Sequence, residues 1–167
     1  METNRRMRKG AEFNQDRRYR FRLWRIWDED TPPTVFIGLN PSTADETQDD
    51  PTVRRCIGFA KKWKTGGLIM TNLFAFRATD PREMKKASDP MHFQNPSKIL
   101  TAAQGARIVV AAWGVHGTHQ AADIRLVQFL KKNGVHLRCL GRTKNGEPRH
   151  PLYMPYDKEL EPYGEEA

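Results

Sequence analysis

The chain has few cysteines and no long apolar segment, and each absence excludes a class of protein. Cys56 and Cys139 are the only cysteines in 167 residues, so they form neither a disulfide framework nor a four-cysteine iron–sulfur cluster. No segment approaches the roughly 18 apolar residues of a membrane span. The basic start is not followed by the apolar run of a signal peptide. We therefore expect a cytoplasmic protein that does not associate with membranes.

Charge of both signs is present, but it is unevenly placed. The chain carries 28 Lys and Arg against 20 Asp and Glu, a net charge of +8. Residues 1–28 contribute +5 and residues 29–156 contribute +7, whereas residues 157–167 contribute −4. A basic body of this kind indicates a polyanionic partner, either nucleic acid or a nucleotide. The simpler alternative is a solvated surface that keeps the protein soluble.

The length fits one domain, and we expect that domain to be a monomer. A flexible basic segment is predicted over residues 1–16, a single α/β domain over residues 17–163, and an acidic tail over residues 164–167. Within the domain, Tyr19, Phe21 and Leu23 alternate with arginines. This period of two predicts a half-buried strand whose Arg20 and Arg22 side chains face solvent.

Buried strands alternate with helices along the rest of the chain. Short apolar runs predict strands over residues 35–39, 68–74, 108–113 and 135–140. Helix starts are predicted at Asp50-Pro51, Asp80-Pro81, Asn95-Pro96 and His119, and the last helix should bury Ile124, Val127 and Leu130. Residues 141–163 should be loops with a weak final helix. The alternation predicts a three-layer α/β sandwich with a mainly parallel central sheet.

Parallel sheets bind ligands beyond the carboxyl ends of their strands, so the residues that follow each strand are the first candidates for a site. Each candidate also has a simpler explanation in turn chemistry, core packing or a solvated loop. His116 and His119 have a spacing that permits a metal, but no cysteine or clustered acid completes a site, so we expect neither metal nor cofactor. In chain order, the candidates are Asn40, Ser42, Asn72, Phe74, Arg77, Trp113, Arg142, Lys144, Arg149 and His150.

Five short motifs carry a resemblance to known families. The strings LNPSTAD, DDPTVRRC, NLFAFRATDP, AAWG and PRHPLY resemble a bacterial and phage family known as domain of unknown function 1643, from about Arg17 to Tyr153. The order of the motifs is also similar to the uracil-DNA glycosylase superfamily. That likeness covers the turn at Asn40-Pro41, Asn72 after a middle strand, Trp113-Gly114 and the His150-Pro151 loop. It implies a uracil-DNA-glycosylase-like fold.

The second resemblance also implies a set of roles for hydrolysis of an N-glycosidic bond. Asn40 would position the attacking water, and His150 would donate to the departing base. Asn72 would read the base edge, with an aromatic side chain, Phe74 or Trp113, against the base. Phosphate contacts would come from Ser42, Arg77, Arg142, Lys144 and Arg149. The implied partner is DNA in preference to RNA.

Two departures from that superfamily leave other functions open. Ser42 follows the proline where Gly or Tyr is frequent, and Leu152 replaces the serine of the late loop. A non-catalytic nucleic-acid-binding module of the same fold is therefore one alternative. An enzyme that acts on a free nucleotide or nucleoside is another.

Overall fold

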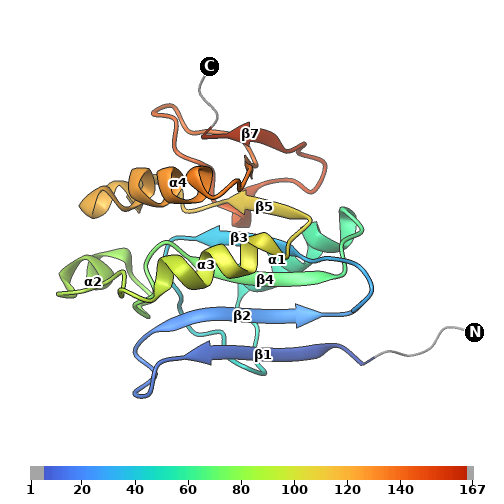
Figure 1. The fold of residues 1–167 in the computed structure, drawn as a ribbon, viewed down its shortest axis with the longest axis horizontal. Coiled ribbons are helices and arrows are strands. Elements are labelled where there is room, and N and C mark those ends of the chain that lie inside the picture. Colours follow the sequence, from blue (N-terminus) through green and yellow to red (C-terminus); the bar gives the residue numbers. More distant parts are fainter. Residues whose placement is uncertain (1–5, 165–167) are drawn as a thin grey trace, which may run out of the picture.

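The computed structural model describes residues 6–164, which form one seven-stranded mixed sheet (Figure 1). Its strand order is β1-β2-β4-β3-β5-β6-β7. The four central strands, β4, β3, β5 and β6, are parallel, and the flanking strands pair in the antiparallel sense. The strands are β1 (Arg8–Phe13), β2 (Arg20–Ile26), β3 (Thr34–Gly38), β4 (Gly67–Asn72), β5 (Ile108–Ala111), β6 (Leu137–Cys139) and β7 (Glu161–Tyr163).

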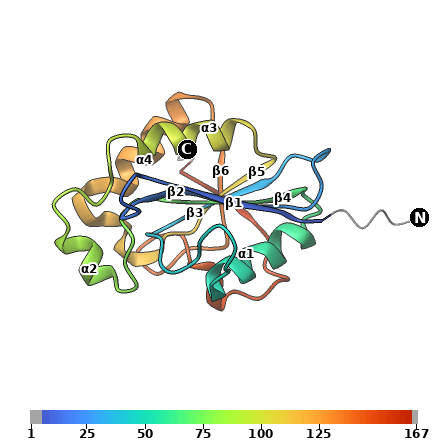
Figure 2. The same cartoon turned by 90° about the horizontal axis from the view of Figure 1, so that it is seen from below.

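Helices cover both faces of this sheet. Figure 2 shows α1 on one face, and α3 and α4 on the other. The predicted α/β fold with a largely parallel centre is therefore confirmed. The helices are α1 (Pro51–Lys62), α2 (Pro81–Lys86), α3 (Asn95–Gln104) and α4 (Ala122–Lys132), with 3-10 segments η1 (Gly114–Ala121) and η2 (Pro151–Tyr153).

Local sequence explains where the first helices begin. Asp50 caps α1 by accepting a hydrogen bond from the Val53 amide at 2.8 Å, and Asp80 caps α2 by accepting from the Arg82 amide at 2.9 Å. In each case a proline follows the cap, where its missing N–H costs nothing. These two aspartates fix the starting points of the helices that flank the ends of β3 and β4.

The core lies on both faces of the central strands, as the apolar runs predict. Along β3, Val35 and Ile37 pack in the cluster under α3 and α4, whereas Phe36 packs in the cluster under α1. All three side chains are fully buried. A strand that is covered on both faces needs apolar residues on both, which is why β3 reads as an unbroken apolar run.

The amino-terminal segment differs from the prediction. Residues 8–13, expected to be flexible, form β1 and pair with β2. Gly10 makes this possible because any Cβ at that position would collide with the Trp24 ring. The Gly10 carbonyl also accepts a hydrogen bond from Arg25 at 3.3 Å. The rest of the expected flexible segment includes residues 1–5, and the acidic tail includes residues 165–167; these lie outside the described residues.

Strand β2 buries both of its faces, which corrects the predicted exposure of Arg20. Phe21 and Leu23 are buried as expected, but Arg20 is also buried, with 2% of its surface exposed. Arg22 is half-buried beside Glu12. The simple alternation fails because the pairing of β1 with β2 is irregular between Glu12 and Phe13, where Phe21 has no partner. Arg20 therefore reaches the loop after β3, which Arg25 also contacts.

The carboxyl-terminal third contains two smaller differences. Helix α4 begins at Ala122, after non-helical backbone at His119 and Gln120, and it buries Ala122, Leu126 and Leu130. Ile124, expected in the core, is instead 58% exposed. The predicted weak final helix is wrong: residues 161–163 form β7, which closes the sheet beside β6.

The topology creates a crevice at one edge of the sheet. From β3 the chain passes through α1 to β4 on one side, and from β5 it passes through α4 to β6 on the other. Because the connections diverge, the carboxyl ends of β3 and β5 are left uncovered between them. This switch point is where the candidate site lies.

Candidate functional site at the carboxyl ends of the parallel strands

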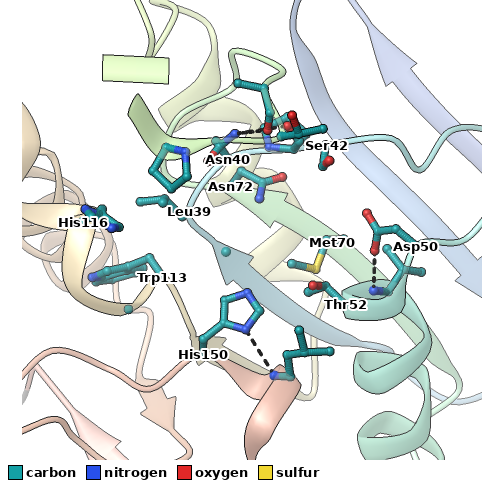
Figure 3. A pocket seen from close by; sticks show the side chains of 18 of the residues that line it. Leu39, Asn40, Ser42, Asp50, Thr52, Met70, Asn72, Trp113, His116 and His150 are labelled. Carbon is teal, nitrogen blue, oxygen red and sulfur yellow. Dashed lines mark hydrogen bonds between the residues drawn. The ribbon is translucent and has the colours of Figure 1, made fainter. Parts of the chain in front are cut away.

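A cavity of about 440 Å³ occupies the switch point. Its walls come from segments far apart in the chain: the ends of β3 and β4, the start of α1, the start of η1, and the loop that begins η2. Figure 3 shows their side chains converging on one space. Five of the predicted residues line it, namely Asn40, Ser42, Asn72, Trp113 and His150.

Asn40 is held at the cavity wall by its amide nitrogen. Nδ2 donates to the Ala78 carbonyl at 2.7 Å and to the Pro41 carbonyl at 3.2 Å. Two carbonyls therefore fix which end of the amide is nitrogen. Among the described residues, no donor reaches the Asn40 Oδ1 atom. The oxygen is left as an acceptor that can bind a water or a ligand hydroxyl.

Asn72 presents a hydrogen-bond donor to the cavity, whereas Asn40 presents an acceptor. Its Oδ1 accepts a hydrogen bond from Arg20 at 3.1 Å, and its Nδ2 points into the open space (Figure 3). Gly38 makes room for this amide, because a Cβ there would lie 2.9 Å from Nδ2. The side chain is nearly fully buried, so its polar atoms serve the cavity wall rather than solvent.

His150 faces Asn72 from the other side of the cavity and acts as a donor (Figure 3). It caps η2 through Nδ1, which accepts a hydrogen bond from the Leu152 amide at 3.2 Å. A ring nitrogen that accepts carries no proton, so the neutral ring holds its proton on Nε2. Burial lowers the pKa of His150, against a smaller opposing effect of the Asp50 charge. His150 is therefore neutral at pH 7, with an N–H available to a ligand.

Of the three acids that the sequence places beside the expected site, Asp45, Asp49 and Asp50, only Asp50 lines the cavity. Its carboxylate also accepts from the Val53 amide. The neighbouring acids are engaged elsewhere: Asp49 forms an ion pair with buried Arg25 at 2.8 Å, and Asp45 accepts from the Gln48 amide at 2.8 Å. One carboxylate thus remains in the cavity wall, where it disfavours a bound phosphate.

The two predicted aromatic residues have different positions. Trp113 lines the cavity, is 1% exposed and meets Tyr163 edge-to-face at 5.6 Å between ring centroids. Its Nε1 is buried without a hydrogen-bond partner among the described residues. Phe74 is fully buried in the core, near His119, and does not line the cavity. The structure therefore places Trp113, and not Phe74, where a ligand could touch it.

The four predicted phosphate-binding cations lie outside the cavity lining. Arg77 is half-buried and donates to the carbonyls of Arg17 at 3.1 Å and Ser42 at 3.4 Å. Arg142, Lys144 and Arg149 are exposed on the segment after β6. A phosphate contact by any of these side chains would be made outside the cavity, by a ligand that extends beyond it.

Arg20 is a cavity residue that the sequence does not indicate as a site residue. Its guanidinium donates to the Ala44 carbonyl and to Asn72 Oδ1, each at 3.1 Å, and its Nε has no partner among residues 6–164. Burial lowers the pKa of Arg20 to about 10, partly offset by the Asp50 charge. The pattern of alternating residues contains no signal for this, because it does not show the irregular pairing with β1 that lets Arg20 reach the loop after β3.

His116 lines the cavity, but its surroundings do not form a metal site. Its Nδ1 lies 3.0 Å from Lys85 Nζ, and burial together with the Lys85 charge lowers its pKa. Across residues 6–164 there is no group of three or more His, Cys, Asp or Glu side chains that could hold a metal ion. In the same part of the chain, no helix is both long and apolar enough to cross a bilayer.

Fold and site together define an α/β protein with a cavity at the switch point of its sheet, into which a few polar side chains converge. The chain belongs to the family described as protein of unknown function (DUF1643), whose model matches residues 20–152. No curated protein and no solved structure matches the chain. The matched span includes all ten predicted site residues as well as Arg20 and Asp50.

Proposed function

We propose that the protein recognises a base of DNA in this cavity and excises it by hydrolysing its N-glycosidic bond. The main support is the pair of N–H groups on opposite walls, His150 Nε2 and Asn72 Nδ2. Departing nucleobases carry negative charge on ring nitrogen atoms and exocyclic oxygen atoms, and preorganised donors stabilise such charge. The motif order shared with the uracil-DNA glycosylase superfamily supports the same chemistry and a fold of that type.

Asn40 supplies the second element of the reaction. Its free Oδ1 can orient a water molecule, but an amide cannot accept the proton of that water. The carbon–nitrogen bond would therefore break first, with its electron pair leaving on the base beside His150. The water oxygen would then bond to the cationic sugar carbon and lose its proton to solvent.

Charge in the cavity favours a base over a phosphate as the enclosed group. Asp50 lines the wall, and the guanidinium of Arg20 is already engaged by Asn72 and Ala44. The backbone phosphates of DNA would remain outside, within reach of the exposed Arg142, Lys144 and Arg149 side chains. This distribution argues against an enzyme whose cavity encloses a free nucleotide.

We propose that the protein acts as a cytoplasmic monomer.

One observation supports a second candidate, a base-binding module without catalysis. The two carbonyl contacts of the Asn40 amide would also be made by a residue that only stabilises the turn after β3. In that case the cavity would bind a flipped base without releasing it.

Incubating the protein with single- and double-stranded oligonucleotides that carry normal and modified bases tests both candidates. Released base and alkali-labile sites are measured. For a glycosylase, Asn40→Ala should slow turnover while binding persists, and His150→Ala should slow it by roughly 10²–10³-fold, as for one lost oxyanion donor. Asn133→Ala, on the exposed end of α4, is the control. Wild-type turnover in Asn40→Ala would overturn the mechanism, and binding without release would favour the module.

A further inference from the structure

The contact between Arg20 and Asn72 joins two buried side chains, one on β2 and the other at the end of β4. Arg20 is 2% exposed and Asn72 is 2% exposed, and Nη2 of the arginine lies 3.1 Å from Oδ1 of the asparagine. Both residues line the cavity. The second guanidinium arm is held by the Ala44 carbonyl at 3.1 Å, so the arginine is fixed at two points.

This contact determines which end of the amide faces the ligand. The two ends of an asparagine amide have nearly the same shape, and only their hydrogen-bond partners distinguish them. Arginine has donors and no acceptor, so it can hold only the oxygen. With Oδ1 held by Arg20, the nitrogen must face the cavity, as Figure 3 shows.

We propose that Arg20 is a specificity-determining positioning residue, which makes Asn72 a hydrogen-bond donor and thereby selects base edges that present a carbonyl oxygen over edges that present an amino group. The inference rests on the proposed function, because it assigns an edge preference to the same base-binding cavity. A carbonyl oxygen accepts from Asn72 Nδ2. An amino group there would set two donors against each other, and both would lose their partners in a buried site.

The shape of the cavity limits how the amide could escape this constraint. Gly38 lies against Asn72, because a single added Cβ at Gly38 would lie 2.9 Å from Nδ2 and 2.8 Å from the Met70 methyl group. The amide therefore has little room to move toward Gly38, away from a mismatched group. Rotation of the amide would break the Arg20 contact and leave the guanidinium facing an N–H.

The test compares pairs of bases that differ in whether the base edge presents a carbonyl oxygen or an amino group. Single-stranded oligonucleotides carry one central deoxyuridine or deoxycytidine, or one central deoxyinosine or deoxyadenosine, and affinities are measured by fluorescence anisotropy. Wild-type protein should prefer the carbonyl member of at least one pair by about tenfold or more, the scale expected for unpaired buried donors. In Arg20→Met the amide can rotate, and the preference should fall to within about twofold.

Arg25→Met is the matched control. Arg25 is equally buried on the same strand, with 0% exposure, but it contacts the loop after β3 and not Asn72. This variant should lose stability and keep the preference of the wild type. If it loses the preference as Arg20→Met does, Arg20 has only a structural role and the inference is overturned.

Asn72→Asp tests the same point without removing the arginine. A carboxylate paired with Arg20 still faces the cavity but has no N–H to donate, so the preference should reverse toward the amino member of the pair. A retained carbonyl preference would overturn the inference. Equal affinity of the wild type for both members of each pair would overturn it too, while leaving the proposed function standing. Binding to none of the four oligonucleotides would also overturn the inference, and the base-release experiment on single- and double-stranded DNA would then decide the proposed function separately.

Discussion

The buried arginines of β2 and the exposed arginines that follow β6 have different structural roles. Arg20 and Arg25 are buried, whereas Arg142 and Arg149 are exposed. The buried pair shapes the cavity: Arg20 holds Asn72, and Arg25 donates to the carbonyls of the loop after β3, including that of Asp45 at 2.6 Å. The exposed pair lies outside the cavity lining. Residue type and local charge therefore do not reveal which arginines build a site.

The difference follows from the partners available at each place. The loop after β3 directs several backbone carbonyls at β2, and Asp49 adds a carboxylate 2.8 Å from Arg25. Charged groups are tolerated in an interior only when their hydrogen bonds are made, and here one guanidinium organises an entire loop. On the segment after β6, Arg142 donates to the Pro162 carbonyl at 2.9 Å and remains exposed to water.

The largest expected effect on stability comes from replacing Arg25, which is buried on β2. Arg25→Met should lower the free energy of unfolding by about 3–5 kcal/mol, because it leaves Asp49 and several carbonyls without their donor. Arg142→Met, its exposed counterpart, should change stability by less than about 0.5 kcal/mol. Urea denaturation of both variants measures the contrast, and equal losses would abolish the distinction between the two regions.

The segment after β6 reaches the cavity through His150, and pH can reveal this contribution. Burial lowers the folded-state pKa of His150 below the usual value of about 6.5. The neutral His150 ring therefore contributes fully to stability above about pH 6.5. This contribution is lost as the pH falls from about 6.5 through the folded-state pKa, because the unfolded chain binds the proton first. Wild type should lose more stability than His150→Ala across this window in denaturation experiments from pH 8 to pH 5. Parallel curves would contradict a half-buried histidine that is neutral in the folded protein.

The smallest expected effect concerns the exposed cations. If Arg149 contacts a DNA phosphate, Arg149→Ala should weaken binding similarly for all sequences and reduce the salt dependence of log K by about one unit. Arg107→Ala, an exposed arginine before the start of β5 and so at the opposite edge of the sheet, should leave the slope unchanged. The measurement is a salt titration of affinity. An equal change in both variants would mean that position relative to the cavity is irrelevant.

Features governed by local rules could be predicted from the sequence. The buried parallel strands appear as apolar runs, and the starts of α1 and α2 follow from Asp50-Pro51 and Asp80-Pro81. Asn40 and His150 could be identified because the ends of parallel strands meet at one edge. Their convergence on one cavity agrees with that expectation.

Features that depend on tertiary neighbours could not be predicted. The burial of Arg20 depends on the irregular pairing of β2 with β1 and on the loop after β3, and neither can be read from the alternation of residues. Phe74 follows Asn72 by two residues, but β4 ends at Asn72, so the alternation of faces no longer applies beyond it. Its ring enters the core, while the amide of Asn72 enters the cavity.

The strand order has a consequence for engineering. The first and last strands, β1 and β7, lie at opposite edges of the sheet, whereas the ends of many domains lie close together (Figure 1). Seven strands define six spacings of about 4.8 Å, so these edges are about 29 Å apart. A circular permutant would therefore need a linker of at least about nine extended residues to join β7 to β1. Energy transfer between fluorophores attached to β1 and β7 would measure the distance between the two edges of the sheet. A change in that distance would report separation of strands, independently of ligand binding in the cavity.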